Sequence, residues 1–338
     1  MAMTIYDISK KAGVSIATVS RVLNGSENAR PSTRKKVMDV IDKYDYTPNA
    51  FARGMGLHSL KTIGILCADS SDLFLAKAVY FLEQELQANG YESLLCCTGY
   101  NPDIKKNYLN LILSKKVDSI ILVGSHFIGF NEDENQYIKD VSTQVPIMLL
   151  NASFDHPNVY STLCDDYGTM FEAATEMIQS GITDILYLYD SKSYSGLKKL
   201  HGFCDAMKEY NIPGFEKLIH FYDGNIEHLN EVADFVARIA TKGTSFHGIM
   251  TSDDSLAIGS IKYAQKKGIR IPEELSVMGY NNSMLTNCCT PELTSVDNRL
   301  ETQTHQLVQT LLGVLAGEEM PKKSIFSGKI IKRGTTLF

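Results

Sequence analysis

The sequence predicts an α/β protein in which a small all-α unit precedes two subdomains built on doubly wound parallel sheets. Up to about residue 47, apolar residues recur only at helical spacing. From residue 62 onward, short buried-strand patterns alternate with helical ones, which is typical of parallel sheets with helical crossovers. The charge also divides there, because residues 1–60 carry nine Lys or Arg and five Asp or Glu, whereas the whole chain has a net charge of −6.

The composition limits the classes of function that remain. A length of 338 residues with 44% hydrophobic residues is enough for two or three domains. No apolar run reaches the ~18 residues of a membrane span, and the N-terminus is too polar for a signal peptide, so we expect a cytoplasmic protein with no membrane partner. Seven cysteines without CxxC spacing indicate reduced thiols, and neither a metal nor a cofactor is predicted.

Three short helices are expected in residues 1–47, the headpiece. Thr4 is a good N-cap for a first helix that ends at Gly13, and Ser15 caps a second helix. Pro31 opens a third helix with an inward apolar stripe. Two helices joined by a tight turn and braced by a third form a helix-turn-helix, whose second helix enters the major groove of DNA. The basic charge of this end favours the same partner, although a merely soluble basic tail would carry it too.

The second helix has an unusual outward face, which begins with the apolar pair Ile16 and Ala17. Their side chains can pack on the C5-methyl group of thymine, and the guanidinium of Arg21 can bind guanine O6 and N7. A helix whose Ile16 contacts another protein surface is the alternative. Polar residues suited to phosphate oxygens lie on or beside the same face: Ser15, Ser20 and Asn24.

These residues carry a resemblance to a known family. "TIYDISKKAGVSIATVSRVLNG", followed by "RPSTRKKVMDVIDKYDYTPNAFARG", resembles the headpiece of LacI/GalR-family repressors, and most closely their catabolite-control branch. The resemblance implies a dimeric repressor that recognises a palindromic operator. It also implies that Ile16, Ala17 and Arg21 contact bases. Further residues would lie near the DNA backbone or brace the headpiece: Thr4, Tyr6, Ser15, Thr18, Ser20, Asn24 and Asn49.

The same resemblance makes residues 48–61 a hinge that folds into a helix on the operator. Met55 would then occupy the position from which the family inserts a wedge into the minor groove, with Arg53 beside it. Gly54 and Gly56 flank the wedge, and each raises the cost of helix formation by about 1 kcal/mol relative to alanine. We therefore expect a hinge that is disordered without DNA.

Seven buried strands and their crossover helices are expected after the hinge. The helices are predicted at about 73–89, 102–115, 167–179, 196–210, 226–241 and 254–267. No GxGxxG, Walker A or GxSxG pattern occurs, which disfavours nucleotide and hydrolase chemistry. The strands are predicted at 62–68, 93–97, 118–124, 145–150, 184–189, 246–252 and 274–280.

This part resembles the regulatory core of the same family, which is related to periplasmic sugar-binding proteins. The matching pieces are "VDSIILVG", "CDDYG", "KLHGF", "SDDSLAIG", "IPEELSVMGYNN", "TPELTSV" and "KRGTT". The resemblance implies an effector-binding and dimerisation domain over residues 62–338. Its N-subdomain would take in about 62–163 and 292–320, and its C-subdomain about 164–291 and 321–338.

Effector contacts follow from the resemblance by position, with three departures from the family pattern. Lys199 stands where the family has an arginine, so the charge is kept but the planar fork is lost. Asp253 replaces an asparagine, and Asn281 replaces an aspartate. A small carbohydrate still fits such polar residues beside an aromatic ring. The expected effector contacts are Asp69, Phe74, Asn151, Asp165, Ser195, Lys199, Asp253 and Asn281.

Several alternatives stay open at this stage. Phe74 either stacks on a ligand ring or lies in the core. Asp165–Asp166 and Asp253–Asp254 are either catalytic pairs or, as we favour, helix N-caps and ligand hydrogen-bonders. The apolar residues of helix 300–315 either pair two regulatory domains or face the core: Leu307, Leu311, Leu312 and Leu315.

The expected function is that of a non-enzymatic, dimeric repressor whose operator affinity is controlled by a small effector, and which joins the bacterial nucleoid when bound to DNA. If the catabolite-control resemblance extends to regulation, a phosphocarrier protein is a further partner. The alternative is a cytoplasmic α/β solute-binding protein or enzyme with an incidental N-terminal extension.

Overall fold

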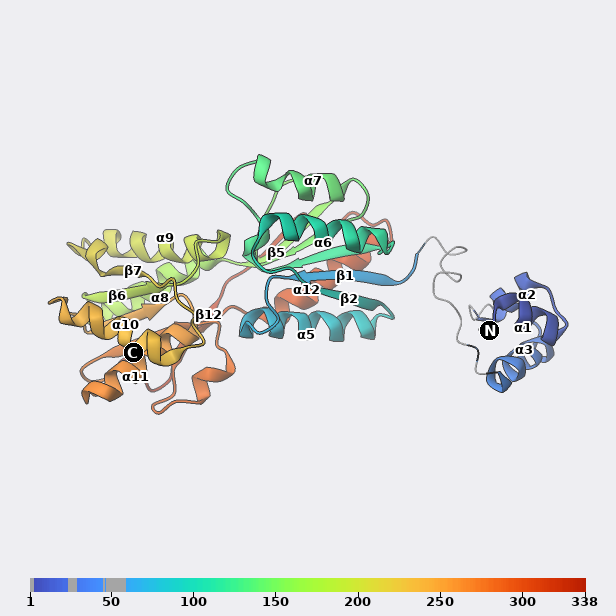
Figure 1. Cartoon of the computed structure of the whole chain (residues 1–338). Helices are drawn as coiled ribbons and strands as arrows, with labels where there is room; N and C mark the ends of the chain where they lie inside the picture. The colour runs from blue at the N-terminus through green and yellow to red at the C-terminus, as the bar shows by residue number, and fades with distance from the viewer. Residues whose placement is uncertain (1–2, 24–28, 45, 47–58) are drawn as a thin grey trace.

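The computed structural model describes residues 3–23, 29–44, 46 and 59–338 (Figure 1). The greater part of the expected hinge, residues 48–58, lies outside the described residues. So do four of the expected DNA contacts: Asn24, Asn49, Arg53 and Met55. The described residues include no helix with the length and apolar content that crossing a bilayer demands.

The headpiece consists of helices α1 (Ile5–Ala12), α2 (Ile16–Leu23) and α3 (Pro31–Lys43). Gly13 ends α1 in the left-handed conformation, with φ of 65°, which glycine adopts without the steric cost that a side chain would bring. The turn lets α2 cross α1 after only a few residues, as the sequence predicts. The three helices share one small core: Ile8, Val19, Val22, Val37, Ile41 and Tyr46.

The first large sheet is fully parallel, with the strand order β11-β5-β4-β3-β1-β2. Helices α5 (Leu73–Ala88) and α12 (Leu300–Leu315) contribute to the core on one face, and α6 (Pro102–Ser114) and α7 (Gln136–Ser142) cover the other. Both faces are therefore covered, which explains the near-continuous apolar runs of its central strands. Its strands are β1 (Thr62–Cys67), β2 (Glu92–Cys97), β3 (Ser119–Val123), β4 (Ile147–Leu150), β5 (Val159–Cys164) and β11 (Lys323–Phe326).

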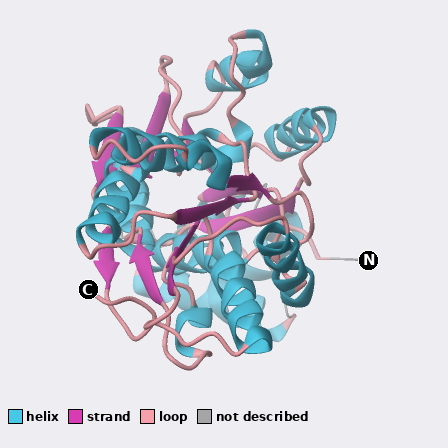
Figure 2. Ribbon diagram, turned by 90° about the vertical axis from the view of Figure 1, so that its left-hand side faces the viewer, coloured by secondary structure: helices cyan, strands magenta, loops and turns pink. Residues whose placement is uncertain are grey.

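The second sheet has the order β12-β10-β9-β8-β6-β7, and β12 is its antiparallel member. Helices α8 (Asp166–Gln179) and α9 (Tyr194–Glu209) pack on one face, and α10 (Leu229–Thr241) and α11 (Asp254–Lys267) on the other. Figure 2 shows helices on either side of the strands. The strands are β6 (Ile185–Tyr189), β7 (Ile219–Phe221), β8 (Gly248–Thr251), β9 (Ser276–Tyr280), β10 (Thr294–Asp297) and β12 (Lys329–Ile331).

The expected α/β class with two parallel-sheet subdomains is confirmed, but the C-terminal crossings differ from the prediction. Residues 292–320 were expected in the first subdomain, whereas β10 lies in the second sheet beside β9. Residues 321–338 were expected in the second, whereas β11 pairs with β5 in the first. The apolar pattern of a strand shows that the strand is buried, but it does not show which sheet the strand joins. Only the observed strand pairing assigns β10 and β11 to their sheets.

The apolar face of α12 belongs largely to the core. Leu307 and Leu311 are fully buried in the first subdomain, and Leu312 and Leu315 are partly buried against the same cluster. These four leucines therefore form a core face, which is one of the two roles that the sequence left open for this helix; the other was the pairing of two regulatory domains.

Candidate DNA-contacting helix and ligand cleft

Helix α2 has one buried and one exposed face, as a base-contacting helix requires. Val19 and Val22 are buried against the other headpiece helices. Ile16 is 39% exposed, and Ala17 and Arg21 are also exposed, so this apolar pair and its neighbouring cation are free to meet a partner. The exposed part of this apolar pair lies on the same face as Arg21, so the face offers apolar surface beside a cation.

The polar residues at the start of α2 support its first turn. The Thr18 amide donates to Ser15 Oγ at 3.2 Å, and the two side-chain hydroxyls lie 2.9 Å apart. Ser15 therefore caps the helix, as expected, and it is exposed beside the helix N-terminus, where phosphate oxygens bind favourably. Ser20, further along α2, is half-buried.

The first headpiece helix begins with a capping box. The Thr4 amide and hydroxyl donate to Asp7 Oδ2 at 2.9 and 2.7 Å, and these bonds hold the pKa of Asp7 below its usual value. Thr4 is thus placed as a bracing residue. Tyr6, two residues on, is 68% exposed and is available for a backbone contact.

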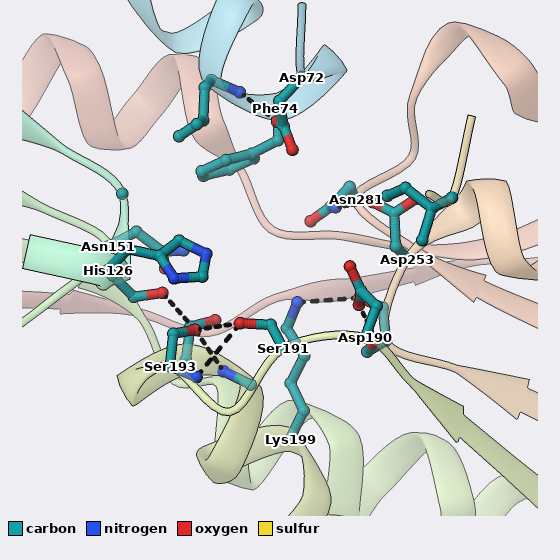
Figure 3. A pocket seen from close by; sticks show the side chains of 17 residues that line it. Asp72, Phe74, His126, Asn151, Asp190, Ser191, Ser193, Lys199, Asp253 and Asn281 are labelled. Carbon is teal, nitrogen blue, oxygen red and sulfur yellow. Dashed lines mark hydrogen bonds between the residues drawn. The ribbon is translucent and has the colours of Figure 1, made fainter. Parts of the chain in front are cut away.

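A cavity lies between the two large sheets, where the carboxyl ends of their strands meet, and parallel α/β sheets bind ligands at this edge. The inner part has a volume of about 80 Å³. An outer groove of about 660 Å³ shares Asp72, His126, Asp190 and Asp253 with it. Six of the eight expected effector residues line the inner part: Phe74, Asn151, Ser195, Lys199, Asp253 and Asn281. All of them except Ser195 are labelled in Figure 3.

The other two expected residues lie elsewhere. Asp69 lines only the outer groove, where it accepts hydrogen bonds from the Ser71 amide and hydroxyl, both at 2.8 Å, which lower its pKa. Asp165 is exposed and caps α8 by accepting from the Gly168 amide at 3.0 Å. It lines neither part of the cleft, so the expectation of an effector contact at Asp165 is corrected to a helix N-cap.

The buried neighbour Asp166 takes part in the cavity's support. It accepts hydrogen bonds from Ser195 Oγ at 2.5 Å and from the Tyr280 hydroxyl at 2.7 Å. Burial raises its pKa, and the nearby Lys199 ammonium opposes that rise. The hydrogen bond to Asp166 therefore fixes the hydroxyl of Ser195. The sequence did not predict this supporting role for Asp166.

Lys199 is held at the floor of the cavity. Its Nζ donates to the Ser252 carbonyl oxygen at 3.0 Å and lies 4.0 Å from the centroid of the Tyr280 ring. The side chain is only 8% exposed. One of the three N–H donors of Lys199 is already used. It therefore has fewer hydrogen bonds left for a ligand than the forked guanidinium of the family's arginine would have.

Asp253 and Asn281 form a direct pair. Asn281 Nδ2 donates to Asp253 Oδ2 at 2.8 Å, and Asn298 donates in turn to Asn281 Oδ1 at 2.9 Å. Burial raises the pKa of Asp253 to about 7, with further contributions from Asp190 and Asp254. Asp253 and Asn281, which both depart from the family pattern, are therefore in direct contact. They form an acid–amide pair in which the acid and the amide have exchanged positions.

Several lining residues escaped the sequence analysis. Asp190 follows β6 directly and accepts from Ser252 Oγ at 2.7 Å, so its position at a strand end was a usable signal. Burial lowers the pKa of His126 to about 4, which keeps its imidazole neutral. Ser125 donates to Ser193 across the cleft at 2.8 Å, and no local pattern announces that contact. The polar side chains missed are those of Asp72, Ser125, His126, Asp190, Ser191, Ser193 and Ser252.

The cleft combines an aromatic ring with a dense set of acceptors. Phe74, Asp190 and Asp253 extend into the same space in Figure 3. The carboxyl groups of Asp72, Asp190 and Asp253 line the inner part together with Lys199, which is already bonded to a backbone carbonyl, so acidic groups outnumber basic ones there. The described residues include no cluster of His, Cys, Asp or Glu side chains suited to a metal ion.

Comparisons with known proteins agree with this architecture. Residues 4–49 match the bacterial regulatory proteins of the lacI family, and residues 174–336 match the periplasmic binding protein-like domain. An HTH-type transcriptional regulator of Lachnoclostridium phytofermentans is 49% identical over 99% of this chain and its own full length. Catabolite control protein A of Priestia megaterium is 32% identical, with 88% of this chain and 87% of that protein covered.

Solved structures share the fold at lower identity. The lac repressor dimer bound to operator and the anti-inducer ONPF superposes with a TM-score of 0.89 at 20% identity, and both chains are covered completely. A complex of the transcriptional regulator CelR with cellobiose has a TM-score of 0.70 at 20% identity, with 98% and 99% covered. From the helix-turn-helix, the two-sheet core and the full-length relatives together, the chain belongs to the LacI family of DNA-binding transcriptional regulators.

Proposed function

We propose that the protein is a homodimeric repressor that binds a palindromic operator through α2 and releases or tightens its grip when a small polar effector enters the cleft. The observation that carries the proposal is the exposed pair Ile16 and Ala17 beside Arg21 on a helix whose opposite face is buried. An apolar pair at the exposed start of such a helix suits thymine methyl groups, and the guanidinium suits guanine.

The polar headpiece residues belong to the same proposal as DNA-backbone contacts. Ser15 and Tyr6 are exposed, and Thr4 and Thr18 brace the first turns of their helices. The remaining members are proposed from the family resemblance: Ser20, Asn24, Asn49, Arg53 and Met55.

An exposed apolar groove supports the homodimer. Leu73, Tyr80 and Met284 are 43%, 52% and 70% exposed, and they line a groove of about 610 Å³ next to α5. Large apolar side chains gathered at one surface are typical of a protein interface. A second copy is the occupant that a palindromic operator requires, since its two half-sites need two headpieces.

The cleft favours a hydroxyl-rich effector without negative charge, such as a neutral sugar. Asp72, Asp190 and Asp253 offer acceptors for hydroxyl groups, and Phe74 offers an apolar surface for a ring face. A phosphate or carboxylate would meet these carboxylates, while Lys199 is already bonded to a backbone carbonyl. The cellobiose complex of CelR shows that a protein with this fold accommodates a sugar.

Effector and operator are proposed to be coupled through the relative position of the two subdomains. Ser125 and Ser193 join them across the cleft, and Asn298 connects the Asp253–Asn281 pair to the start of α12, on the first subdomain. A ligand that favours one cleft geometry shifts the population toward it, and the resulting coupling to DNA affinity must be reciprocal.

The proposed DNA partner also determines the location that we propose for the protein. We place the protein in the cytoplasm, on the nucleoid when it is bound. The relatives are regulators, and regulation without catalysis is the proposed role. We propose no phosphocarrier partner.

The salt dependence of binding to a palindromic duplex tests the proposal. A dimeric regulator gives a steep negative slope of log affinity against log salt concentration, because bound phosphates release counterions. A solute-binding protein or enzyme with an incidental extension gives no such slope. Equal weak binding to palindromic and scrambled duplexes would contradict the sequence-specific function.

A further inference from the structure

Two cysteine side chains meet at the edge of the first sheet. Cys67 ends β1 and Cys97 ends β2, and the two residues are registered partners across these parallel strands. Their Sγ atoms lie 3.8 Å apart. Neighbouring strands are ~4.8 Å apart, which falls within the ~4.4–6.8 Å Cα separation that disulfides span. A bond between these sulfurs therefore needs side-chain rotation and no rearrangement of the sheet.

The neighbouring Cys96 is excluded from this pair. Side chains alternate along a strand, so Cys96 faces the other side of the sheet, where it packs against the cluster that contains Leu109 and Ile120. The remaining cysteines lie in other elements. Cys96 is consequently a matched internal control for Cys97, one residue away and on the opposite face.

The two thiols differ in access to solvent. Cys97 is exposed on β2, the edge strand of its sheet, whereas Cys67 is fully buried. Burial, together with the adjacent Cys97, raises the pKa of Cys67 to about 12, so Cys67 alone does not react with an oxidant at neutral pH. Any oxidant must enter at Cys97, and Cys67 is then the thiol within reach.

We propose that Cys67 and Cys97 form a dithiol modification site that a small disulfide, such as an oxidised low-molecular-weight thiol, converts into an intrachain disulfide. The Cys97 thiolate attacks the small disulfide, forms a mixed disulfide and releases one thiol. Cys67 then attacks Cys97 Sγ as its proton passes to the departing sulfur, which leaves as the second thiol. Two protein thiols are oxidised and one small disulfide is reduced to two thiols.

A Cys67–Cys97 disulfide would restrain the two chain segments that follow β1 and β2 and that line the outer groove. The Thr98 amide donates to the Cys67 carbonyl at 2.9 Å, and the Gly99 amide donates to the Ala68 carbonyl at 2.8 Å. The chain then continues from both strands into groove-lining residues, Asp69 and Asp72 from one and Tyr100 from the other. A covalent link at the last registered pair holds these two segments together directly beneath the groove.

Oxidation of the reduced full-length protein with glutathione disulfide tests the proposal. After acid trapping and alkylation, peptide mapping should find Cys67 joined to Cys97, in a chain that migrates as a monomer on a non-reducing gel and is restored by dithiothreitol. The Cys96→Ser variant should keep the cross-link, and the Cys97→Ser variant should lose it. Amide hydrogen exchange over residues 68–74 and 98–102 should slow on oxidation in the wild type and in the Cys96→Ser variant, but not in the Cys97→Ser variant.

Three outcomes would overturn the proposal. One is a lasting glutathione adduct on Cys97 with Cys67 still alkylated. Another is a Cys97–Cys97 bond between two chains, which the gel separates from the intrachain product. The third is recovery of unmodified thiols from wild-type protein. The mapping is made on wild-type protein, so it does not depend on how either variant folds. None of the three outcomes bears on the proposed DNA-binding function.

Discussion

Asn281 donates a hydrogen bond to Asp253 across 2.8 Å at the mouth of the cleft, and each of the two residues departs from the family pattern. Taken singly along the chain, the departures suggest a lost ligand contact at each position. In space they form one acid–amide pair, so the cleft keeps a carboxylate and a carboxamide side by side. The relation also extends outward, because Asn298 donates to Asn281 and Gln303 donates to the Asn298 carbonyl.

Exchanging the two side chains should test this pair. Asn281→Asp alone places two carboxylates at hydrogen-bond distance, and we expect a loss of about 1–3 kcal/mol in the free energy of unfolding near neutral pH. Adding Asp253→Asn should recover much of that loss, because an acid–amide pair forms again. Chemical denaturation of the two single variants and the double variant measures the coupling. Strict additivity of the three values would show that the pair carries no interaction of its own.

Substitutions on α2 should separate base recognition from general DNA affinity. Ile16→Gln and Ala17→Gln replace methyl-binding surfaces with hydrogen-bonding groups, so we expect the preferred operator bases to change, by about 1–3 kcal/mol per altered base pair. Ser15→Ala should weaken binding to all sequences alike. Selection from a randomised duplex library, followed by titration, measures both effects. Unchanged base preference in both glutamine variants would refute the assignment of this face.

The acidic cleft should discriminate against anionic ligands. We expect a neutral sugar that raises the unfolding temperature to lose this effect when it carries a phosphate, because the phosphate meets Asp72, Asp190 and Asp253. Thermal unfolding with matched sugar and sugar-phosphate pairs measures the difference. The Asp165→Asn variant serves as a control, since Asp165 lies outside the cleft and asparagine is also a good N-cap. If the sugar phosphate stabilised the protein more than the matched neutral sugar, the proposal that the cleft prefers uncharged ligands would be wrong.

Stability should fall as the pH rises toward 7 because of Asp253. Its pKa in the folded protein is about 7, above the ordinary 3.8, so the folded state binds the proton more tightly than the unfolded chain. The stabilisation is complete below pH ~4 and is lost as the pH rises through 7. Asp254, whose pKa is raised to about 6, contributes in the same direction, and Asp72, Asp190 and Lys199 set the local field.

Denaturation of wild-type protein and Asp253→Asn between pH 5 and 8 isolates this contribution. The variant should show a smaller decline over that range, while Asp165→Asn should follow the wild type. Parallel pH profiles for wild type and Asp253→Asn would mean that the carboxyl group of Asp253 is already ionised at pH 5.

The local signals of the sequence determined the headpiece and the succession of strands and helices. Thr4, Gly13, Ser15 and Pro31 specify helix starts and a turn through the local backbone and contacts within a few residues, so they can be recognised before the tertiary fold is known. The alternation of buried strands with helices fixed the class of the core for the same reason. The outward face of α2 could also be read from its 3.6-residue period.

Tertiary structure alone decided which polar residues share the cleft. Asp165 and Asp166 are adjacent in sequence, yet one caps α8 in solvent and the other supports Ser195 from a buried position. Strand pairing placed β10 and β11 in different sheets, and it brought Cys67 within 3.8 Å of Cys97. Such relations join residues well separated along the chain, 30 positions apart for Cys67 and Cys97, and they depend on sheet order and packing, which no local pattern encodes.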